Sequence, residues 1–266
     1  MTGPVNDVDP TGQVAGWWGT AVSRMEPGVL ELRGRPVQDL IGRTGLAGVI
    51  WLMLRGELPD PGRARLLEAA LVAAVDHGPQ APSVAIARMA VTCGVGLNNA
   101  VASGVNVLGD VHGGAGEQCV ELLDRVRELA ATGLDLAAAA DRVIAEGPRY
   151  LPGFGHRFHP VDPRRDPLLS LVDGAVRDGL VAGDHLRAGL ALEARLTTVR
   201  RRPVPMNIDG ATAIIFAELG FPAPLARGLF VLSRSVGILA HAWEEAGQGR
   251  RNKGPVPPSV LPAYLG

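Results

Sequence analysis

The sequence contains few aromatic residues, few cysteines and no excess of charge of either sign. Aromatic residues make up 4% of the 266 residues, whereas glycine (35) and proline (21) are plentiful. This favours helices that pack closely through small residues over an all-β sandwich. Lys plus Arg number 26 against 27 Asp plus Glu, and no run of five like charges occurs. We therefore expect a globular protein that binds neither nucleic acid nor an anionic membrane surface.

The two cysteines, Cys93 and Cys119, lack CxxC spacing and argue against a disulfide framework. They predict a reducing, cytoplasmic compartment. Residues 89–109 carry no charge over 21 positions, which is long enough to span a bilayer. This stretch also contains polar side chains and four glycines, which favours a buried helix pair in a crowded interface and no membrane span.

Strand signals are confined to residues 23–37, where a Pro-Gly turn and alternating apolar residues predict a small hairpin. The remaining pattern is helical, so the fold class is predicted to be all-α. A buried helix over 46–54 should end at Arg55 and Gly56, and Asp60-Pro61 should open the next helix through Val75. Asp166-Pro167 repeats that start signal. Further helices are predicted at 116–131, 134–146, 185–199, 209–219 and 224–246.

Candidate chemistry lies partly in residues 147–166, which are dense in Gly, Pro, Arg and His and are expected to form a functional loop. His77, His112 and His156 each lie in a glycine-rich or helix-end context, where a ligand can approach the backbone closely. Each alone is also compatible with an ordinary turn or core histidine. His156 and His159 are three residues apart, but the surrounding glycines argue against a helix, so no metal is expected.

Two charged residues stand out among apolar neighbours. Asp209 lies where a helix should begin, and Gly210 keeps its carboxylate accessible, although a helix-start acid can also be purely structural. Arg234 lies within the apolar stretch 229–240. A buried guanidinium needs an anionic partner. That partner is either a structural carboxylate or a substrate carboxylate.

Six ordered motifs together resemble the citrate synthase superfamily, as does the segment 30–59, and the resemblance runs from about residue 23 to 243. The motifs are His77, His112-Gly-Gly-Ala, Gly-Phe-Gly-His156-Arg, Asp162-Pro-Arg164, Asn207-Ile-Asp209 and Arg234-Ser-Val-Gly. The last two look most similar to the citryl-CoA lyase branch, which includes the C-terminal module of ATP-citrate lyase. The resemblance implies an all-α homodimer. Its large domain would comprise 1–114 and 223–266, with a smaller inserted domain at 115–222.

The resemblance also implies a role for each motif residue. Asp209 matches the carboxylate that moves a proton next to the thioester carbonyl. His112 matches the residue that stabilises the enolate oxygen, and His156 matches the acid or base at the other partner's oxygen. The implied binders of substrate carboxylates are His77, Arg164 and Arg234. Those implied near coenzyme A are Arg157, Gly153 and Gly155.

The implied activity is cleavage of citryl-CoA to acetyl-CoA and oxaloacetate, with coenzyme A entering as the acyl-CoA substrate. The alternative is a citrate or 2-methylcitrate synthase, and a non-catalytic binding or assembly subunit is the alternative of another class. A citryl-CoA-forming synthetase is the protein partner that cleavage would call for. Two departures from the family pattern leave residues open. Full synthases place a further arginine near the C-terminus; here either Arg250 or Arg251 would complete a neighbouring subunit's site, or this subsite binds something smaller or differently charged. The stretch between His156 and Asp162-Pro-Arg164 is one residue shorter than in the usual synthase form, so either Arg164 or Arg165 would bind carboxylate.

Overall fold

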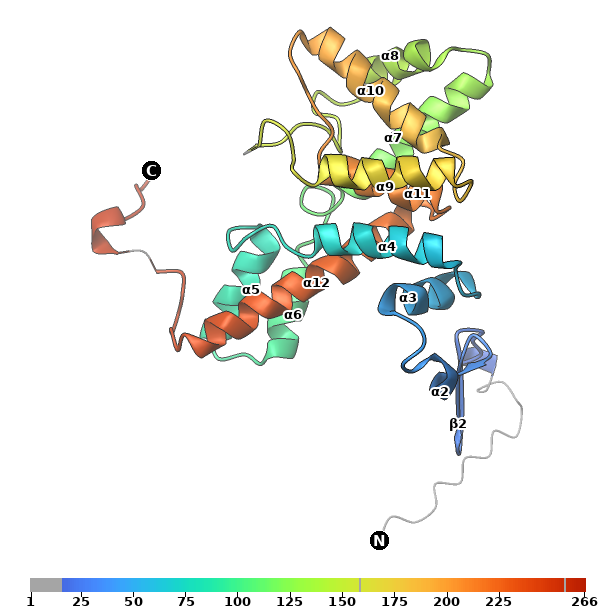
Figure 1. Cartoon of the computed structure of the whole chain (residues 1–266). Coiled ribbons are helices and arrows are strands. Elements are labelled where there is room, and N and C mark those ends of the chain that lie inside the picture. Colours follow the sequence, from blue (N-terminus) through green and yellow to red (C-terminus); the bar gives the residue numbers. More distant parts are fainter. Residues whose placement is uncertain (1–15, 158, 256) are drawn as a thin grey trace. The chain divides into compact units, whose positions relative to one another are not determined.

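The computed structural model describes residues 16–157, 159–255 and 257–266, and the fold is mostly helical as the sequence predicts (Figure 1). The chain divides into two compact units, with the boundary between Ala64 and Arg65. The predicted division into a large domain (1–114 and 223–266) and an insert (115–222) stays a prediction.

The first unit contains a small antiparallel sheet and short helices. Its strands are β1 (Ser23–Glu26), β2 (Val29–Leu32) and β3 (Arg35–Pro36), followed by the helices α2 (Val37–Leu40) and α3 (Leu46–Arg55). The predicted hairpin is confirmed, and β3 extends it to three strands. As predicted, α3 ends at Gly56, whose φ of 86° is the left-handed conformation that glycine adopts at low cost.

Helix α4 (Pro61–Ala74) runs from the first unit into the second, which is otherwise built from eight further α-helices. These are α5 (Pro82–Thr92), α6 (Leu97–Val105), α7 (Ala115–Ala131), α8 (Leu136–Glu146), α9 (Arg165–Arg177), α10 (Asp184–Arg200), α11 (Ile208–Glu218) and α12 (Ala223–Gly247). A short 3₁₀ turn, η1 (Pro258–Val260), follows. The predicted helices agree with these to within two residues at each end. For α9 the predicted start signal Asp166-Pro167 lies inside the helix, which already begins at Arg165.

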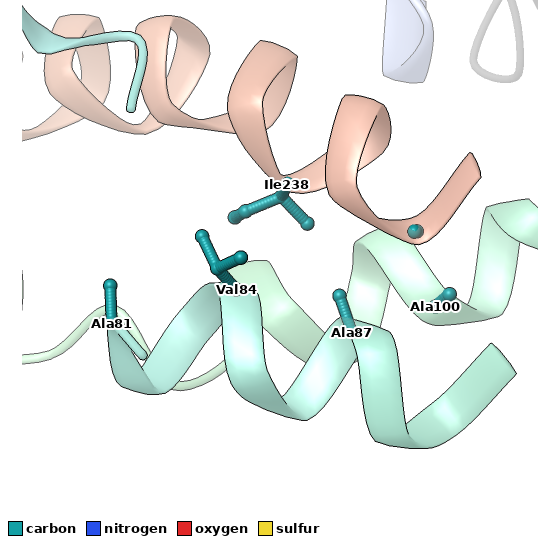
Figure 2. Close-up of a cluster of buried hydrophobic side chains, with 6 residues drawn as sticks. Ala81, Val84, Ala87, Ala100 and Ile238 are labelled. Carbon is teal, nitrogen blue, oxygen red and sulfur yellow. The ribbon is translucent and has the colours of Figure 1, made fainter. Parts of the chain in front are cut away.

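Helix α12 organises the second unit by packing against α5, α6, α7 and α11 (Figure 1). The buried helix pair expected around 89–109 is α5 and α6. Small side chains let it approach α12, and the cluster in Figure 2 joins Ala87 and Ala100 to Ile238. A Cβ on Gly104 would lie 2.8 Å from Cγ2 of Ile238 and 2.7 Å from the Ser83 carbonyl oxygen. This close packing explains the small residues in that stretch.

Within the described residues, α12 is the one helix long and apolar enough to cross a membrane by length and composition. Its buried side chains include Arg234 and Glu245, as expected for a core helix that packs on other helices. Glu245 is paired with Arg88 and Lys253. The Lys253 amide also donates to Thr92 Oγ1, which fixes the segment after α12 against the end of α5.

Candidate active site

Six residues predicted to form a site lie close enough in the second unit to influence one another's ionisation. They come from loops, helix ends and the middle of one helix, spread between positions 77 and 234 of the chain. They are His77 after α4, His112 between α6 and α7, His156 between α8 and α9, Arg164 just before α9, Asp209 in the first turn of α11, and Arg234 within α12. The tertiary fold therefore assembles one charged centre from them.

The C-terminal end of α4 anchors both guanidinium groups. Arg164 Nη1 donates to the Ala73 carbonyl over 3.3 Å, and Arg234 Nε donates to the Ala74 carbonyl over 3.1 Å. The last carbonyls of a helix lack partners within it and favour cations. A Cβ on Gly237 would lie only 2.1 Å from the Val75 carbonyl oxygen, so glycine is required where α12 crosses this helix end.

Arg234 is only 5% exposed and lies with its guanidinium 4.8 Å from the centre of the Phe230 ring. Burial lowers the pKa of Arg234, and the nearby negative charges of Asp209 and Asp76 oppose that shift. Within the described residues, no carboxylate lies in ion-pair contact with it at 4.0 Å or less. Of the two partners that the sequence left open, a structural carboxylate is therefore not found in the part of the chain that the structure describes.

His112 is held in one tautomer by the start of α5. Its Nε2 accepts the Ser83 amide N–H over 3.1 Å, so the neutral ring carries its proton on Nδ1. Burial and then the positive charge of Arg234 lower the pKa of His112 below 6.5. His112 is therefore a neutral hydrogen-bond donor at pH 7, which suits stabilisation of an enolate oxygen.

His156 and His77 lie side by side, with ring centroids 5.5 Å apart. His156 Nδ1 accepts the His159 amide over 3.1 Å, which places the proton of the neutral ring on Nε2. Burial lowers the pKa of both rings. For His77 the charges of Arg164 and Arg234 add to this effect, whereas for His156 the charge of Asp162 opposes it.

The structure places Arg164, and not Arg165, in this centre. Arg164 makes two side-chain hydrogen bonds to Asp162, each 2.9 Å long. Arg165 instead turns to Glu193 and Asp166. Of the two arginines that the sequence left open, Arg164 is therefore the one that the fold brings to this centre.

Asp209 lies in the first turn of α11, which Asn207 caps. The Asn207 side chain accepts the amide of Asp209 over 2.9 Å and donates to the Gly155 carbonyl over 2.7 Å, so it ties the helix to the α8–α9 loop. Burial raises the pKa of Asp209, and Arg234 and Arg164 oppose the rise. Burial, followed by the charge of Asp209, also raises the pKa of the Cys119 thiol. A raised pKa keeps that thiol protonated and unreactive.

Two glycines allow α11 and this loop to meet. Gly153 has a φ of 84°, and a Cβ on Gly210 would lie 2.5 Å from the Gly153 carbonyl oxygen. The Asn207 amide donates to the same carbonyl over 3.0 Å. The contact between the loop and the start of α11 therefore requires the absence of a side chain at both positions.

Replacing Gly210 by alanine should destabilise the protein by about 1–3 kcal/mol, because the new methyl group forces the helix and the loop apart. Gly174 within α9 provides the matched control, since its nearest neighbour would be Arg177 Nη2 at 3.9 Å. Gly174→Ala should stabilise slightly, by about 0.5–1 kcal/mol. Urea unfolding of the two variants tests this, and equal stabilities would contradict the close contact.

A pocket of about 640 Å³ adjoins the centre at His156. Four arginines line it, and among the residues that the structure describes no acidic side chain does so. They are Arg149, Arg157, Arg200 and Arg202. The predicted residues Gly155 and Arg157 lie in this lining, whereas Gly153 lies against Gly210 and Cys119. Such a pocket suits a ligand with several negative charges.

Sequence reasoning gave no role to several residues that shape this region. Ser83 is 29 positions from the histidine that it orients, so no local pattern could reveal it. The arginines Arg200 and Arg202 stand in a visible basic run at the end of α10, which was a usable signal. Asn207, directly before the apolar start of a helix, carried a capping signal.

No group of three or more His, Cys, Asp or Glu side chains in the described residues could hold a metal ion.

Comparison with known proteins agrees with this arrangement. Residues 53–254 match the family described as citrate synthase, C-terminal domain. The structure is similar to citryl-CoA lyase from Hydrogenobacter thermophilus, with a TM-score of 0.82, 30% identity and coverage of 94% of each chain.

Similarity to longer proteins covers only part of them. Citrate synthase of Acidithiobacillus ferridurans is 28% identical over 203 residues, which are 73% of this chain and 49% of the relative. ATP-citrate synthase subunit 1 of Sordaria macrospora is 29% identical over 232 residues, 80% of this chain and 33% of that protein. The chain thus spans about half of one relative and a third of the other. Because the family match covers most of the chain, this protein belongs to the citrate synthase family.

Proposed function

We propose that this protein cleaves citryl-CoA to acetyl-CoA and oxaloacetate. One observation carries the proposal: a carboxyl group with a raised pKa and neutral imidazoles share one centre with two guanidinium groups, beside an arginine-lined pocket. The similarity to a citryl-CoA lyase also covers 94% of both chains, whereas the citrate synthase relative is matched over about half its length.

Substrate binding is assigned to the cationic groups. Arg164, Arg234 and His77 would hold the carboxylates of the citryl group, because charge-assisted hydrogen bonds from guanidinium groups suit planar carboxylates. The four arginines of the adjoining pocket would take the phosphates of coenzyme A, with Arg157 and Gly155 among the lining residues. The thioester would then lie between the pocket and the centre.

Cleavage requires a base at the citryl hydroxyl and an acid at the new methyl carbon. His156 accepts the hydroxyl proton at Nδ1 after that atom releases the His159 amide. The carbon–carbon bond then breaks, a carbonyl forms on oxaloacetate, and the electron pair moves onto the thioester as an enolate. His112 donates from Nδ1 to the enolate oxygen, and protonated Asp209 delivers a proton to the carbon, which gives acetyl-CoA.

Burial raises the pKa of Asp209, which shifts the carboxyl group toward the protonated form from which cleavage starts. The same centre could run condensation in reverse and then hydrolyse the thioester, as in a citrate or 2-methylcitrate synthase. The similarity to a citrate synthase favours that second candidate. The two differ in whether water reaches citryl-CoA.

The test is to incubate the purified protein with citryl-CoA and to separate the products by chromatography. We expect acetyl-CoA and oxaloacetate in equal amounts. Citrate plus free coenzyme A would instead support a synthase. No turnover together with tight binding of citryl-CoA would support a binding subunit and contradict both enzymatic candidates.

Assembly and location are proposed on simpler grounds. An apolar groove of about 430 Å³ lies between α6 and α12, and Val236 and Trp243 in it are exposed. We propose that a second copy covers it in a homodimer.

Arg250 and Arg251 are exposed after α12 and stay candidates for a neighbouring subunit's site. A citryl-CoA-forming synthetase is the proposed partner, and the two unpaired cysteines support a cytoplasmic location.

A further inference from the structure

Asp162 is a buried carboxylate at the centre of the site and has a complete set of partners. It is 1% exposed. Its Oδ1 accepts the amide and the Nε–H of Arg164 over 3.0 and 2.9 Å. Its Oδ2 accepts Nη2–H of Arg164 over 2.9 Å and the Ile208 amide over 3.1 Å. Each oxygen already accepts two hydrogen bonds, so this carboxylate has little capacity left to accept one from a substrate.

These contacts connect three parts of the site, one of which, the start of α11, is 46 positions from Asp162 in sequence. Arg164 precedes α9, and Ile208 is the first residue of α11 and the neighbour of Asp209. The third part is His156, whose Nε2 lies 3.9 Å from Oδ2 of Asp162. A shift of this one carboxylate would therefore move a carboxylate binder, an acid/base group and the helix that carries Asp209.

The orientation of Arg164 leaves part of its guanidinium group available. Asp162 takes Nε–H and one Nη2–H, and the Ala73 carbonyl takes one Nη1–H. Within the described residues, two of the five guanidinium N–H groups therefore stay unpaired, one on each terminal nitrogen. Planar groups of this kind bind carboxylates well only when their direction is fixed.

Charge supports the same role. Burial alone would raise the pKa of Asp162, but hydrogen bonds from Arg164 and Ile208 outweigh it and lower the pKa to about 2. Asp162 is therefore ionised at every pH at which the site would work. Its negative charge offsets one of the two guanidinium charges, those of Arg164 and Arg234, in a centre that must still attract an anionic substrate.

We propose that Asp162 is a positioning residue that fixes Arg164 for binding a substrate carboxylate and couples it to His156 and to the start of α11. The binding part of this inference rests on the proposed function, because it assigns a substrate carboxylate to Arg164. The orienting part does not, since it concerns the ligand-free protein.

A double-mutant cycle separates this role from a purely structural one. Asp162→Asn keeps the shape of the side chain but replaces one acceptor oxygen by an N–H donor. We expect it to weaken oxaloacetate binding, measured by calorimetry at pH 7, by roughly 10-fold or more, and Arg164→Gln to weaken it further. The double variant should bind about as weakly as Arg164→Gln alone. If the losses of affinity in the two single variants multiply in the double variant, the two side chains act independently and the proposal is overturned.

Asp141 supplies a matched control, because it also accepts two hydrogen bonds from one arginine. Arg195 Nε and Nη2 each donate to its carboxylate over 2.7 Å, between α8 and α10. Asp141→Asn should leave oxaloacetate affinity within about 2-fold of the wild type. An equal loss in both asparagine variants would assign the effect to general destabilisation and overturn the positioning role.

A second measurement needs no ligand. The Arg164 Nε–H proton should exchange slowly with water in the wild type and in Asp141→Asn, and rapidly in Asp162→Asn, as followed by NMR. Rapid exchange in the wild type would overturn the inference even if Asp162→Asn does not fold. A wild type that neither binds oxaloacetate nor cleaves citryl-CoA would contradict the proposed function, whereas the exchange rate would still decide whether Asp162 orients Arg164.

Discussion

Replacing Asp209 by asparagine is expected to lower citryl-CoA cleavage by roughly 10²- to 10⁴-fold, because the amide cannot deliver a proton to the enolate carbon. Asparagine keeps the size of the side chain and the helix start that Asn207 caps. Citryl-CoA should therefore still bind. Single-turnover kinetics measure the chemical step directly, and turnover equal to the wild type would remove Asp209 from the mechanism.

The stability of the same variant provides its control. The folded-state pKa of Asp209 is raised above 3.8, so its contribution to stability is full below pH 3.8 and is lost as the pH rises through the raised value. Asparagine lacks that titration. At pH 7 we expect Asp209→Asn to be at least as stable as the wild type in urea. A large loss of stability would instead indicate that the carboxylate holds the fold together.

Replacing Arg234 by methionine should weaken oxaloacetate binding about 100-fold while leaving the melting temperature unchanged or higher. The guanidinium is buried, and within the described residues no carboxylate lies in ion-pair contact with it. Burial lowers its pKa, so folding keeps a charge that is costly without ligand. Methionine fills similar space without that charge. Binding is measured by calorimetry and stability by thermal unfolding.

Arg177→Met on the exposed side of α9 is the matched control, because Arg177 pairs with Asp173 at the surface. It should change neither affinity nor stability appreciably. A marked fall in melting temperature for Arg234→Met would contradict the assignment, since it would show that Arg234 supports the fold. Retained affinity would remove it from the binding site.

Sequence and structure agree most closely on the helices. The start signal Asp60-Pro61 and the stop at Gly56 act within one helical turn, so local chemistry determines them. The Asp166-Pro167 signal predicts a start for α9 that lies slightly after the observed one. Asp162 accepts the Arg164 amide, and α9 begins at Arg165 before the proline. The same Asp162 side chain also accepts the Ile208 amide, 46 positions away, so the segment before α9 is held by a contact that no local pattern reveals.

The sequence by itself determined which residue types could carry the chemistry. The order of His77, His112, His156, Asp209 and Arg234 along the chain was sufficient to indicate the family, because each lies in a local motif. The helical class followed from apolar periodicity, which depends on neighbours three and four positions apart.

Only the tertiary structure decided the contacts, the tautomers and the pKa directions of these groups. Contacts between distant segments place Arg164 against the end of α4, set the tautomer of His112 through Ser83 and direct Arg234 to the Ala74 carbonyl. Burial determines the pKa directions, and burial is a property of the packed chain. A sequence pattern can show a histidine or an acid beside a glycine. Whether that side chain carries a proton depends on the segments that pack against it in the folded chain.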